Sequence, residues 1–226
     1  MEGYTLKFIA RIHTALPEKF GVPRQSGLIP ELKGKIVFEP EYRNADALRG
    51  IEGYSHLWLI WQFSQAVRES WSPLVRPPRL GGNEKMGVFA TRSPFRPNAL
   101  GLSCVELEKV EWDSADAPVL HVRGVDLMDG TPIFDIKPYL TYADSYPDAQ
   151  GGWTDGAERR LLRVECSGEL LTKIPSMQQK ALLAVLENDP RPRYQDDPQR
   201  IYGLSFSGKN VKFRVEGEML YVLSVE

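Results

Sequence analysis

The feature of this sequence that most constrains its fold is a succession of short runs of β-branched, aromatic and aliphatic residues in its first two-thirds. Gly, Pro, Asn and Asp separate these runs. We predict strands at residues 4–13, 35–39, 56–63, 87–91, 102–112, 119–125 and 133–138. Short, closely spaced strands with turn residues between them are typical of a barrel or sandwich and not of βαβ units. The sequence therefore predicts a mainly β fold.

The pattern changes after residue 148. A segment rich in Asp, Gly and Ala predicts a linker at residues 149–160, which divides a β domain at residues 1–148 from a C-terminal subdomain at residues 161–226. One helix is predicted at residues 174–188: Pro175 or Ser176 begins it, Leu182 and Leu186 share one face, and an Asn-Asp-Pro sequence ends it. Strands are predicted at residues 161–171, 201–206, 211–215 and 219–225. The subdomain is therefore expected to be a small α+β unit.

Length and composition exclude several classes of protein. The chain has 226 residues, enough for one large domain or a domain with a small appendage. It contains no apolar run approaching the roughly 18 residues of a membrane helix, and its first residues do not resemble a signal peptide. Two cysteines, Cys104 and Cys166, are too few for a disulfide framework or a metal site. We expect a cytoplasmic protein without a metal.

Several common enzyme signatures are missing from the sequence. It contains neither the glycine fingerprint of dinucleotide-binding folds nor the phosphate loop of nucleotide hydrolases. The serine elbow of hydrolases and the paired histidines of zinc proteases are also missing. The three histidines, His13, His56 and His121, lie inside predicted strands, which favours packing or edge positions over a catalytic base. If the chain is an enzyme, its sequence shows no dedicated nucleophile.

The loop GVFATRSPFRPNALG, at residues 87–101, is unusual in its stiffness and charge. It combines Pro94 and Pro97 with Arg92 and Arg96. Residues 76–98 contain five basic residues and one acidic residue, although the whole chain carries a formal net charge of −2. Such a cluster is either ordinary solvated surface or a site for a phosphate or another polyanion.

Four loop segments place polar side chains where predicted strands end. They are residues 21–25, 63–65, 90–94 and 127–132, and three of the four also contain Pro or Gly. Residues that bind ligands are frequent on loops at the ends of a rigid scaffold. Taken singly, each segment is also explained as a plain turn or as surface charge. Together they offer arginines, a carboxylate, and amide and hydroxyl groups, which favours a binding site.

Five collinear motifs identify a family resemblance. VPRQSG, YRNADALRGIEGYSHLW, VRPPRLGG, GVFATRSPFRPNALG and DLMDGTPIFDIKPYL closely resemble the TsaA-like β-barrel family, whose characterised bacterial type is the TrmO-type tRNA methyltransferase. The resemblance extends from about residue 8 to residue 148. It resumes at NDPRPRY, residues 188–194, which is similar to a DPRPxY segment of that type.

This resemblance implies a fold and an activity. The fold is a compact antiparallel β-barrel, unlike the usual α/β methyltransferase, and the protein is a homodimer. The activity is S-adenosylmethionine-dependent methylation of N6 of threonylcarbamoyladenosine, next to the anticodon of threonine tRNA. Because S-adenosylmethionine carries an activated methyl group, such an enzyme needs no nucleophile of its own.

The resemblance also implies site residues. The cofactor contacts fall on Pro23, Arg24, Gln25, Ser64, Gln65, Arg92, Leu102, Asp129, Gly130, Thr131 and Pro132. Relatives often carry His where this chain has Ser64, so a backbone contact is expected there. Asp129 either accepts the N6 proton or binds the ribose or amino group of the cofactor. Arg24 or Arg92 is expected to pair with the methionine carboxylate.

Contacts with tRNA are expected from basic and aromatic side chains, since single-stranded loops are recognised by stacking and phosphate contacts. The candidates are Arg76, Arg79, Arg96, Arg191, Arg193 and Tyr194. Two alternatives to an enzyme remain at this point. One is a non-catalytic RNA- or nucleotide-binding barrel, and the other is a structural module whose arginines contact an acidic protein.

Overall fold

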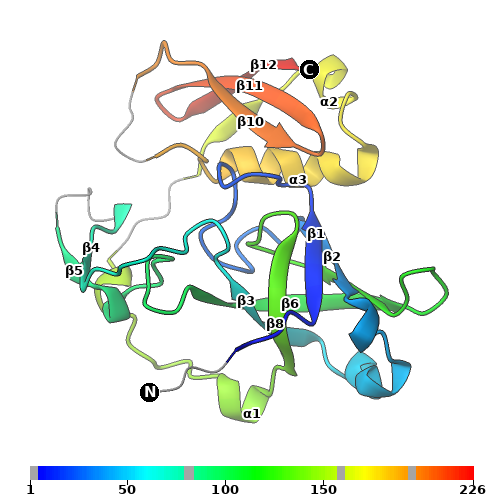
Figure 1. Cartoon of the computed structure of the whole chain (residues 1–226). Coiled ribbons are helices and arrows are strands. Elements are labelled where there is room, and N and C mark those ends of the chain that lie inside the picture. Colours follow the sequence, from blue (N-terminus) through cyan, green and yellow to red (C-terminus); the bar gives the residue numbers. More distant parts are fainter. Residues whose placement is uncertain (1–4, 79–83, 157–160, 193–196) are drawn as a thin grey trace.

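The computed structural model describes residues 5–78, 84–156, 161–192 and 197–226, which form a barrel and a smaller C-terminal unit (Figure 1). Six antiparallel strands close the barrel in the order β1-β2-β7-β6-β3-β8. They are β1 (Ala10–Thr14), β2 (Lys33–Phe38), β3 (His56–Gln62), β6 (Leu100–Glu111), β7 (Val119–Arg123) and β8 (Thr131–Pro138). The predicted mainly β fold with a compact antiparallel barrel is confirmed.

The barrel interior follows from the alternation of side chains along each strand. On β3, Leu57, Leu59 and Trp61 point inward and are buried. Ile36 on β2 and Ile133 on β8 are fully buried in the same core. Because successive side chains of a strand point to opposite faces, this period-two burial fixes which residues fill the barrel.

A two-stranded hairpin and several short helices lie between the strands of the barrel. The hairpin of β4 (Leu74–Val75) and β5 (Met86–Gly87) projects from one side. One-turn helices connect the strands: η1 (Pro40–Tyr42), η2 (Ala45–Leu48), η3 (Ile51–Gly53), η5 (Val88–Ala90), α1 (Thr141–Asp144) and η6 (Gly152–Thr154). Asn44 caps η2 by accepting a hydrogen bond from the Asp46 N–H.

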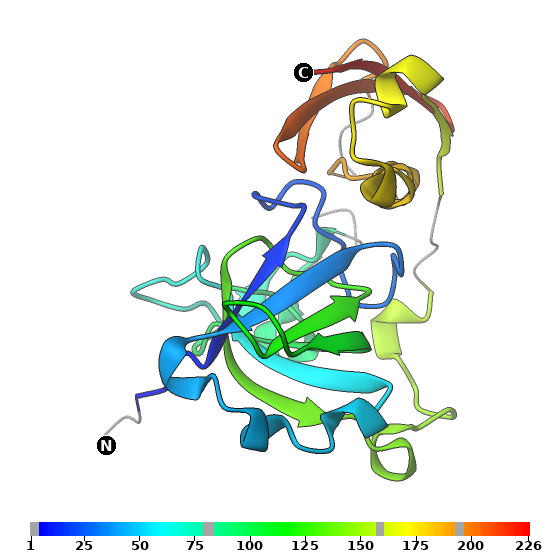
Figure 2. The same ribbon diagram turned by 90° about the vertical axis from the view of Figure 1, so that its right-hand side faces the viewer.

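The C-terminal unit is a four-stranded sheet covered by a helix. Its elements are β9 (Arg163–Glu165), α2 (Gly168–Leu171), α3 (Ser176–Glu187), β10 (Tyr202–Phe206), β11 (Lys209–Glu216) and β12 (Met219–Val225). The sheet order is β10-β11-β12-β9, with β9 parallel to β12. Ala181, Leu182, Val185 and Leu186 form the buried face of α3. Figure 2 shows α3 on the side of this sheet that faces the barrel.

The two units share one hydrophobic core. Leu16, in the loop after β1, is fully buried, and Phe20 stacks on Tyr202 and Phe213 of the C-terminal sheet, with ring centroids 6.5 and 6.3 Å apart. The Ser207 N–H donates a 2.8 Å hydrogen bond to the Ala15 carbonyl. The loop that follows β1 is therefore fixed by the C-terminal unit before it reaches residue 23.

Most predicted elements occur close to their expected bounds, but three differ. The strand predicted at residues 87–91 is wrong, because β5 ends at Gly87 and the Thr91 N–H and hydroxyl both bind the Val88 carbonyl, which closes a 3-10 turn. The strand predicted at residues 161–171 is wrong after Glu165, because the Ser167 hydroxyl caps α2 by accepting from Leu170 N–H at 3.3 Å. The strand predicted at residues 4–13 begins only at Ala10, and Tyr4 lies outside the described residues.

Within the described residues, no helix is both long and apolar enough to cross a membrane. The same part of the chain contains no group of three or more His, Cys, Asp or Glu side chains arranged to hold a metal ion.

Candidate functional site

The polar loops predicted from the sequence meet at one end of the barrel. The register pairs Gln62 at the end of β3 with Leu100 at the start of β6, and Trp61 with Ile133 near the start of β8. On the other side of β8, Thr131 pairs with Ile12 near the end of β1. The ends of β1 and β3 and the starts of β6 and β8 therefore lie at the same end of the barrel, and the segments at residues 63–65 and 127–132 adjoin them. The segment at residues 21–25 lies in the loop after β1, and the segment at residues 90–94 lies in the loop before β6.

Two of these loops are joined by Gln25 and Arg92. The Arg92 guanidinium donates a hydrogen bond to Oε1 of Gln25, which lies 67 residues away in the sequence. The amide nitrogen of Gln25 donates in turn to the Arg24 carbonyl. The structure thus brings together two predicted cofactor contacts, and the contact presents a guanidinium beside a fixed amide at the barrel end.

Behind this pair lies a carboxylate that the sequence reasoning missed. The Ser103 hydroxyl donates to Oδ1 of Asp126 at 2.6 Å and accepts a hydrogen bond from the Trp61 indole N–H at 2.9 Å. Ser103 is completely buried, on the inward face of β6. The only sequence signal was a serine at an inward position of a strand, which needs a polar partner when buried.

The loop at residues 21–27 is anchored to the same cluster through Ser26. Its hydroxyl accepts a 3.0 Å hydrogen bond from the Cys104 N–H, and its own N–H hydrogen-bonds to Asp126. The Gly27 N–H donates to the Gly124 carbonyl at 2.8 Å. These bonds fix the backbone immediately after Gln25 against β6 and against the loop that follows β7.

Asp126 has an unusual electrostatic environment. Burial raises its pKa from 3.8 to about 6, whereas hydrogen bonds from Ser103 and from the N–H groups of Asp126 and Ser26, and the nearby charge of Arg92, act in the opposite direction. Desolvation dominates because removing water disfavours the charged form of a carboxyl group. Asp126 therefore gains or loses its proton near pH 6, which is close to physiological pH.

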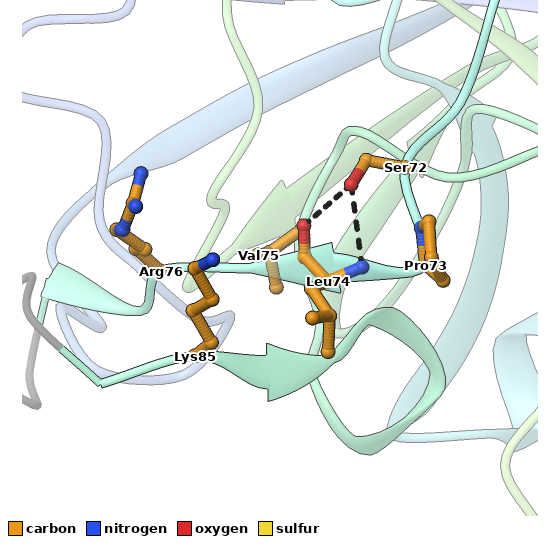
Figure 3. Close-up of a pocket in the computed structure, with 6 residues that line it drawn as sticks. All are labelled: Ser72, Pro73, Leu74, Val75, Arg76 and Lys85. Carbon is orange, nitrogen blue, oxygen red and sulfur yellow. Dashed lines mark hydrogen bonds between the residues drawn. The ribbon is translucent and has the colours of Figure 1, made fainter.

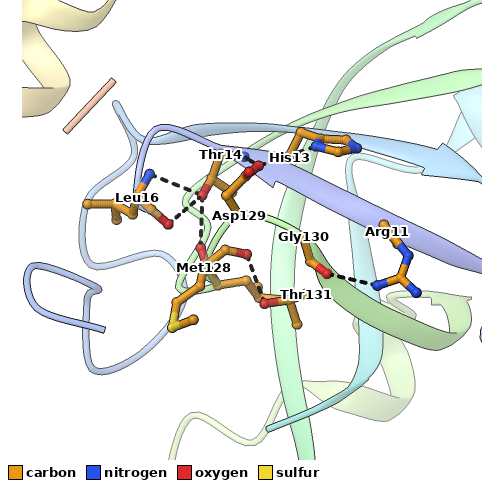
Figure 4. A network of polar contacts seen from close by, with 9 residues as sticks. Arg11, His13, Thr14, Leu16, Met128, Asp129, Gly130 and Thr131 are labelled. Atoms are coloured by element: carbon orange, nitrogen blue, oxygen red, sulfur yellow. Dashed lines mark hydrogen bonds and ion pairs between the residues drawn. The ribbon is translucent and has the colours of Figure 1, made fainter. Parts of the chain in front are cut away.

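Asp129 has a different role in the structure. Its Oδ1 accepts from the Thr14 N–H at 3.0 Å and lies 3.3 Å from His13 Nδ1, as Figure 4 shows. Gly130 has a positive φ of 74°, which suits glycine at this turn, and its carbonyl accepts from Arg11 at 3.2 Å. Asp129 therefore holds the end of β1 against the turn before β8, and the rest of its carboxylate is exposed to solvent.

The other residues predicted to contact the cofactor vary in exposure. Thr131 is buried, and its hydroxyl donates to the Met128 carbonyl at 2.8 Å, while Pro132 pairs with Arg11 in the sheet. Ser64 and Gln65 are exposed just beyond β3. Leu102 points outward from β6 with 54% of its surface exposed. The side chains at Ser64, Gln65 and Leu102 are accessible, whereas Thr131 offers mainly its backbone.

The arginines predicted to contact RNA are placed very differently. Arg76 is exposed beside β4. Arg96 is half-buried, and its Nη1 donates to the carbonyls of Val88 at 3.2 Å and Thr91 at 2.7 Å, which holds its own loop together. The predicted residues Arg79, Arg193 and Tyr194 lie outside the described residues.

Arg191 does not fit the phosphate contact expected of it. Only 8% of its surface is exposed, and its guanidinium binds both carboxylate oxygens of Asp189, at 2.8 and 3.0 Å. It also lies 6.0 Å from the centre of the Tyr202 ring. These contacts indicate that Arg191 braces the C-terminal unit, because its charge is already matched and shielded from solvent.

Comparisons with known proteins match both units of the chain. Residues 11–145 match the family described as the tRNA-methyltransferase O N-terminal domain, and residues 159–226 match the TrmO C-terminal domain. The chain is 39% identical to the tRNA (adenine(37)-N6)-methyltransferase of Escherichia coli K12 over 234 residues, covering 100% of this chain and 99% of that protein.

Two further relatives come from Pseudomonas aeruginosa. The putative S-adenosylmethionine-dependent methyltransferase RcsF is 42% identical over 204 residues, covering 87% of this chain and 86% of that protein. The crystal structure of TrmO superposes with a TM-score of 0.81 at 33% identity, covering 100% of this chain and 98% of that one. The similarity thus includes both the barrel and the C-terminal unit.

Proposed function

The chain belongs to the TrmO family of tRNA methyltransferases, and from this premise we propose that it methylates N6 of threonylcarbamoyladenosine next to the anticodon. The expected substrate is threonine tRNA, and the methyl donor is S-adenosylmethionine. The observation that carries the assignment is the similarity of the whole chain, in both units, to the tRNA (adenine(37)-N6)-methyltransferase of Escherichia coli.

We place the cofactor at the barrel end, against Pro23, Arg24, Gln25 and Arg92. The groups present there fit its chemistry. A guanidinium suits the methionine carboxylate, because it can donate two parallel hydrogen bonds. The exposed carboxylate of Asp129 suits a ribose hydroxyl or the amino group, and the exposed Leu102 offers apolar surface to the adenine. Ser64, Gln65 and the backbone of Gly130, Thr131 and Pro132 complete the proposed site.

The bound cofactor supplies a methyl group already activated on a sulfonium. The task of the protein is then to align the N6 atom with that methyl and to exclude water. Holding the reacting groups in near-attack geometry can supply roughly 7–11 kcal/mol of the barrier. The anchored loop that carries Gln25 suits this role, since Ser26 and Gly27 fix its backbone by hydrogen bonds.

For Asp129 we favour cofactor binding over acceptance of the N6 proton. Its Oδ1 already accepts the Thr14 N–H and lies beside His13, so the carboxylate is committed to the β1–β8 corner. An oxygen that faces solvent can still accept a hydrogen bond from a hydroxyl or amino group without a change in the corner.

We further propose that the enzyme is a homodimer and acts in the cytoplasm. The outer face of the barrel supports a dimer, because Leu100 on β6 lies beside Gln62 on β3 and is 37% exposed. The solvent face of an antiparallel sheet is usually polar. Light scattering on the purified protein would show twice the mass of one chain, and a monomer at micromolar concentration would contradict this proposal.

The function is tested by mass spectrometry of tRNA from cells that lack the gene. We expect threonylcarbamoyladenosine there to lose one methyl group, and the purified chain with S-adenosylmethionine to restore it. A non-catalytic barrel would bind RNA without restoring the methyl group. Unchanged nucleosides in the deletion strain would contradict the assignment to tRNA.

A further inference from the structure

Two aromatic rings lie exposed beside the β4–β5 hairpin. Trp71 precedes β4 and Phe89 follows β5, and their ring centroids are 6.0 Å apart. Trp71 is 51% exposed and Phe89 is 72% exposed. A pair of large apolar rings on the surface is costly in water unless a ligand covers it, so this pair is a candidate binding surface.

The backbone holds Phe89 outward. The preceding residue, Val88, is 1% exposed, and its N–H donates to the Pro73 carbonyl at 2.9 Å. On the following side, the Ala90 carbonyl accepts a 3.0 Å hydrogen bond from the Trp153 indole. Phe89 is therefore fixed between two anchored residues, and its exposure belongs to the folded structure.

A cationic cavity adjoins this aromatic pair. Its volume is about 350 Å³, and residues of the hairpin and the segment before it line it, among them Ser72, Arg76 and Lys85. Figure 3 shows Arg76 and Lys85 extending from neighbouring strands toward the same side. Arg76 follows Val75 and Lys85 precedes Met86, and Val75 and Met86 are paired in the hairpin.

The local charge identifies the kind of ligand. Residues 76–98 contain five basic residues and one acidic residue, in a chain whose net charge is −2. The Arg96 guanidinium also lies 5.8 Å from the centre of the Phe89 ring. Exposed aromatic rings beside cations are the combination by which proteins bind single-stranded nucleic acid, since the rings stack on bases and the cations bind phosphates.

We propose that Trp71 and Phe89 form a stacking platform for an unpaired base of the tRNA anticodon loop. Arg76 and Lys85 then bind phosphates of the neighbouring nucleotides in the adjoining cavity. This inference rests on the proposed function and adds a specific contact surface to it. The platform is connected to the proposed cofactor site along the chain, because Phe89 lies three residues before Arg92, which contacts Gln25.

The test measures binding of a synthetic anticodon stem-loop of threonine tRNA by fluorescence anisotropy. Replacement of one stacking residue typically weakens binding about 5- to 150-fold, so Trp71→Ala and Phe89→Ala should each raise the dissociation constant within this range. Trp71→Phe keeps an aromatic face and should retain most of the affinity. Trp112→Ala is the matched control, because Trp112 is exposed but lies at the other end of β6, and it should bind RNA normally.

The cations are tested by salt dependence. Each phosphate contact to a single strand contributes about −0.7 to the slope of log K against log salt concentration. Arg76→Ala and Lys85→Ala should therefore each reduce the slope by about that amount. In all of these variants the dissociation constant for S-adenosylmethionine should stay within twofold of the wild type.

Two outcomes would overturn the proposal. One is unchanged RNA affinity in the Trp71→Ala/Phe89→Ala double variant. The other is conversion of that double variant from dimer to monomer without loss of RNA affinity, because the rings would then belong to an interface with a second copy. A wild-type protein that binds the stem-loop through these residues but methylates no tRNA would refute the proposed function and leave the platform supported.

Discussion

The hydroxyl of Ser103 and the carboxylate of Asp126 are joined by a 2.6 Å hydrogen bond that links the barrel core to the proposed cofactor site. Ser103 is completely buried and also accepts from Trp61, while Asp126 binds the Ser26 N–H in the loop that carries Gln25. One of the groups that hold this loop is therefore a carboxyl group whose pKa is raised to about 6.

The first prediction concerns stability. Because the folded pKa of Asp126 is raised from 3.8 to about 6, the favourable contribution of its protonated form is fully present below pH 3.8 and is lost as the pH rises through 6. The shift corresponds to roughly 2–3 kcal/mol. Asp126→Asn removes this titration, so its free energy of unfolding relative to wild type should rise between about pH 4 and about pH 7. Urea denaturation at several pH values in this range measures the difference.

The second prediction concerns cofactor affinity. Below about pH 6 Asp126 becomes protonated, which weakens its hydrogen bond with the Ser26 N–H and its attraction for Arg92. The affinity for S-adenosylmethionine should therefore fall as the pH is lowered through 6. Asp126→Asn should bind weakly at every pH, with a flat profile in calorimetry. A variant that retains the wild-type pH profile would show that another group controls the site.

The third prediction concerns the contact between Arg92 and Gln25. A hydrogen bond to a charged group contributes about 1.5–3 kcal/mol, so Arg92→Ala should weaken S-adenosylmethionine binding about 10- to 150-fold. If the two side chains act together, the effects of Arg92→Ala and Gln25→Ala in a double-mutant cycle should be less than additive. Calorimetry that gives wild-type affinity for Arg92→Ala would remove this residue from the cofactor site.

The fourth prediction separates Arg191 from the exposed arginines. The ion pair between Arg191 and Asp189 is only partly buried, because the Asp189 side chain is 29% exposed. Hydrogen bonds to a charged group contribute about 1.5–3 kcal/mol. Arg191→Ala should lower the free energy of unfolding by an amount in this range, because Asp189 loses its bidentate partner. Arg76→Ala should leave stability unchanged. If Arg191→Ala keeps wild-type stability and loses RNA affinity, the sequence-based assignment is right and the structural role is wrong.

The sequence predicted the barrel well because its signals are local. Alternation on β3 identifies Leu57, Leu59 and Trp61 as inward residues without any knowledge of their partners. The error at residues 87–91 has a physical cause. Val88 and Phe89 have strand propensity, but the Thr91 hydroxyl closes a turn on the Val88 carbonyl, and this competes with extension of the strand.

The site was less predictable because its decisive contacts are distant in sequence. Asp126 was not selected, since its partner Ser103 lies 23 residues away and the Ser26 hydroxyl reaches β6 across 78 residues. The roles of Arg96 and Arg191 show the same limit. The sequence shows that these side chains are basic. Only the fold shows that Arg96 donates its hydrogen bonds to its own loop and that Arg191 donates to Asp189, so that these donors are not free for a ligand.

The last prediction tests whether core packing supports the site. A Cβ at Gly101 would lie 2.3 Å from Cε2 of Trp61, a side chain that is only 7% exposed and cannot move freely. Overpacking a core typically costs about 1–3 kcal/mol, so Gly101→Ala should lower the free energy of unfolding by this amount. Displacement of Trp61 also breaks its hydrogen bond with Ser103 and disturbs Asp126, so S-adenosylmethionine affinity should fall as well.

Gly53→Ala is the matched control for this variant, because no heavy atom lies within 4 Å of a Cβ built there. It should leave both stability and cofactor affinity near wild type. Gly101→Ala could lose stability and still keep its S-adenosylmethionine affinity and its pH profile. In that case the hydrogen bonds from Trp61 to Ser103 and from Ser103 to Asp126 do not couple the packing of the core to the cofactor site. Loss of both would show that this glycine is required because the indole must approach the β6 backbone closely enough to hold Ser103.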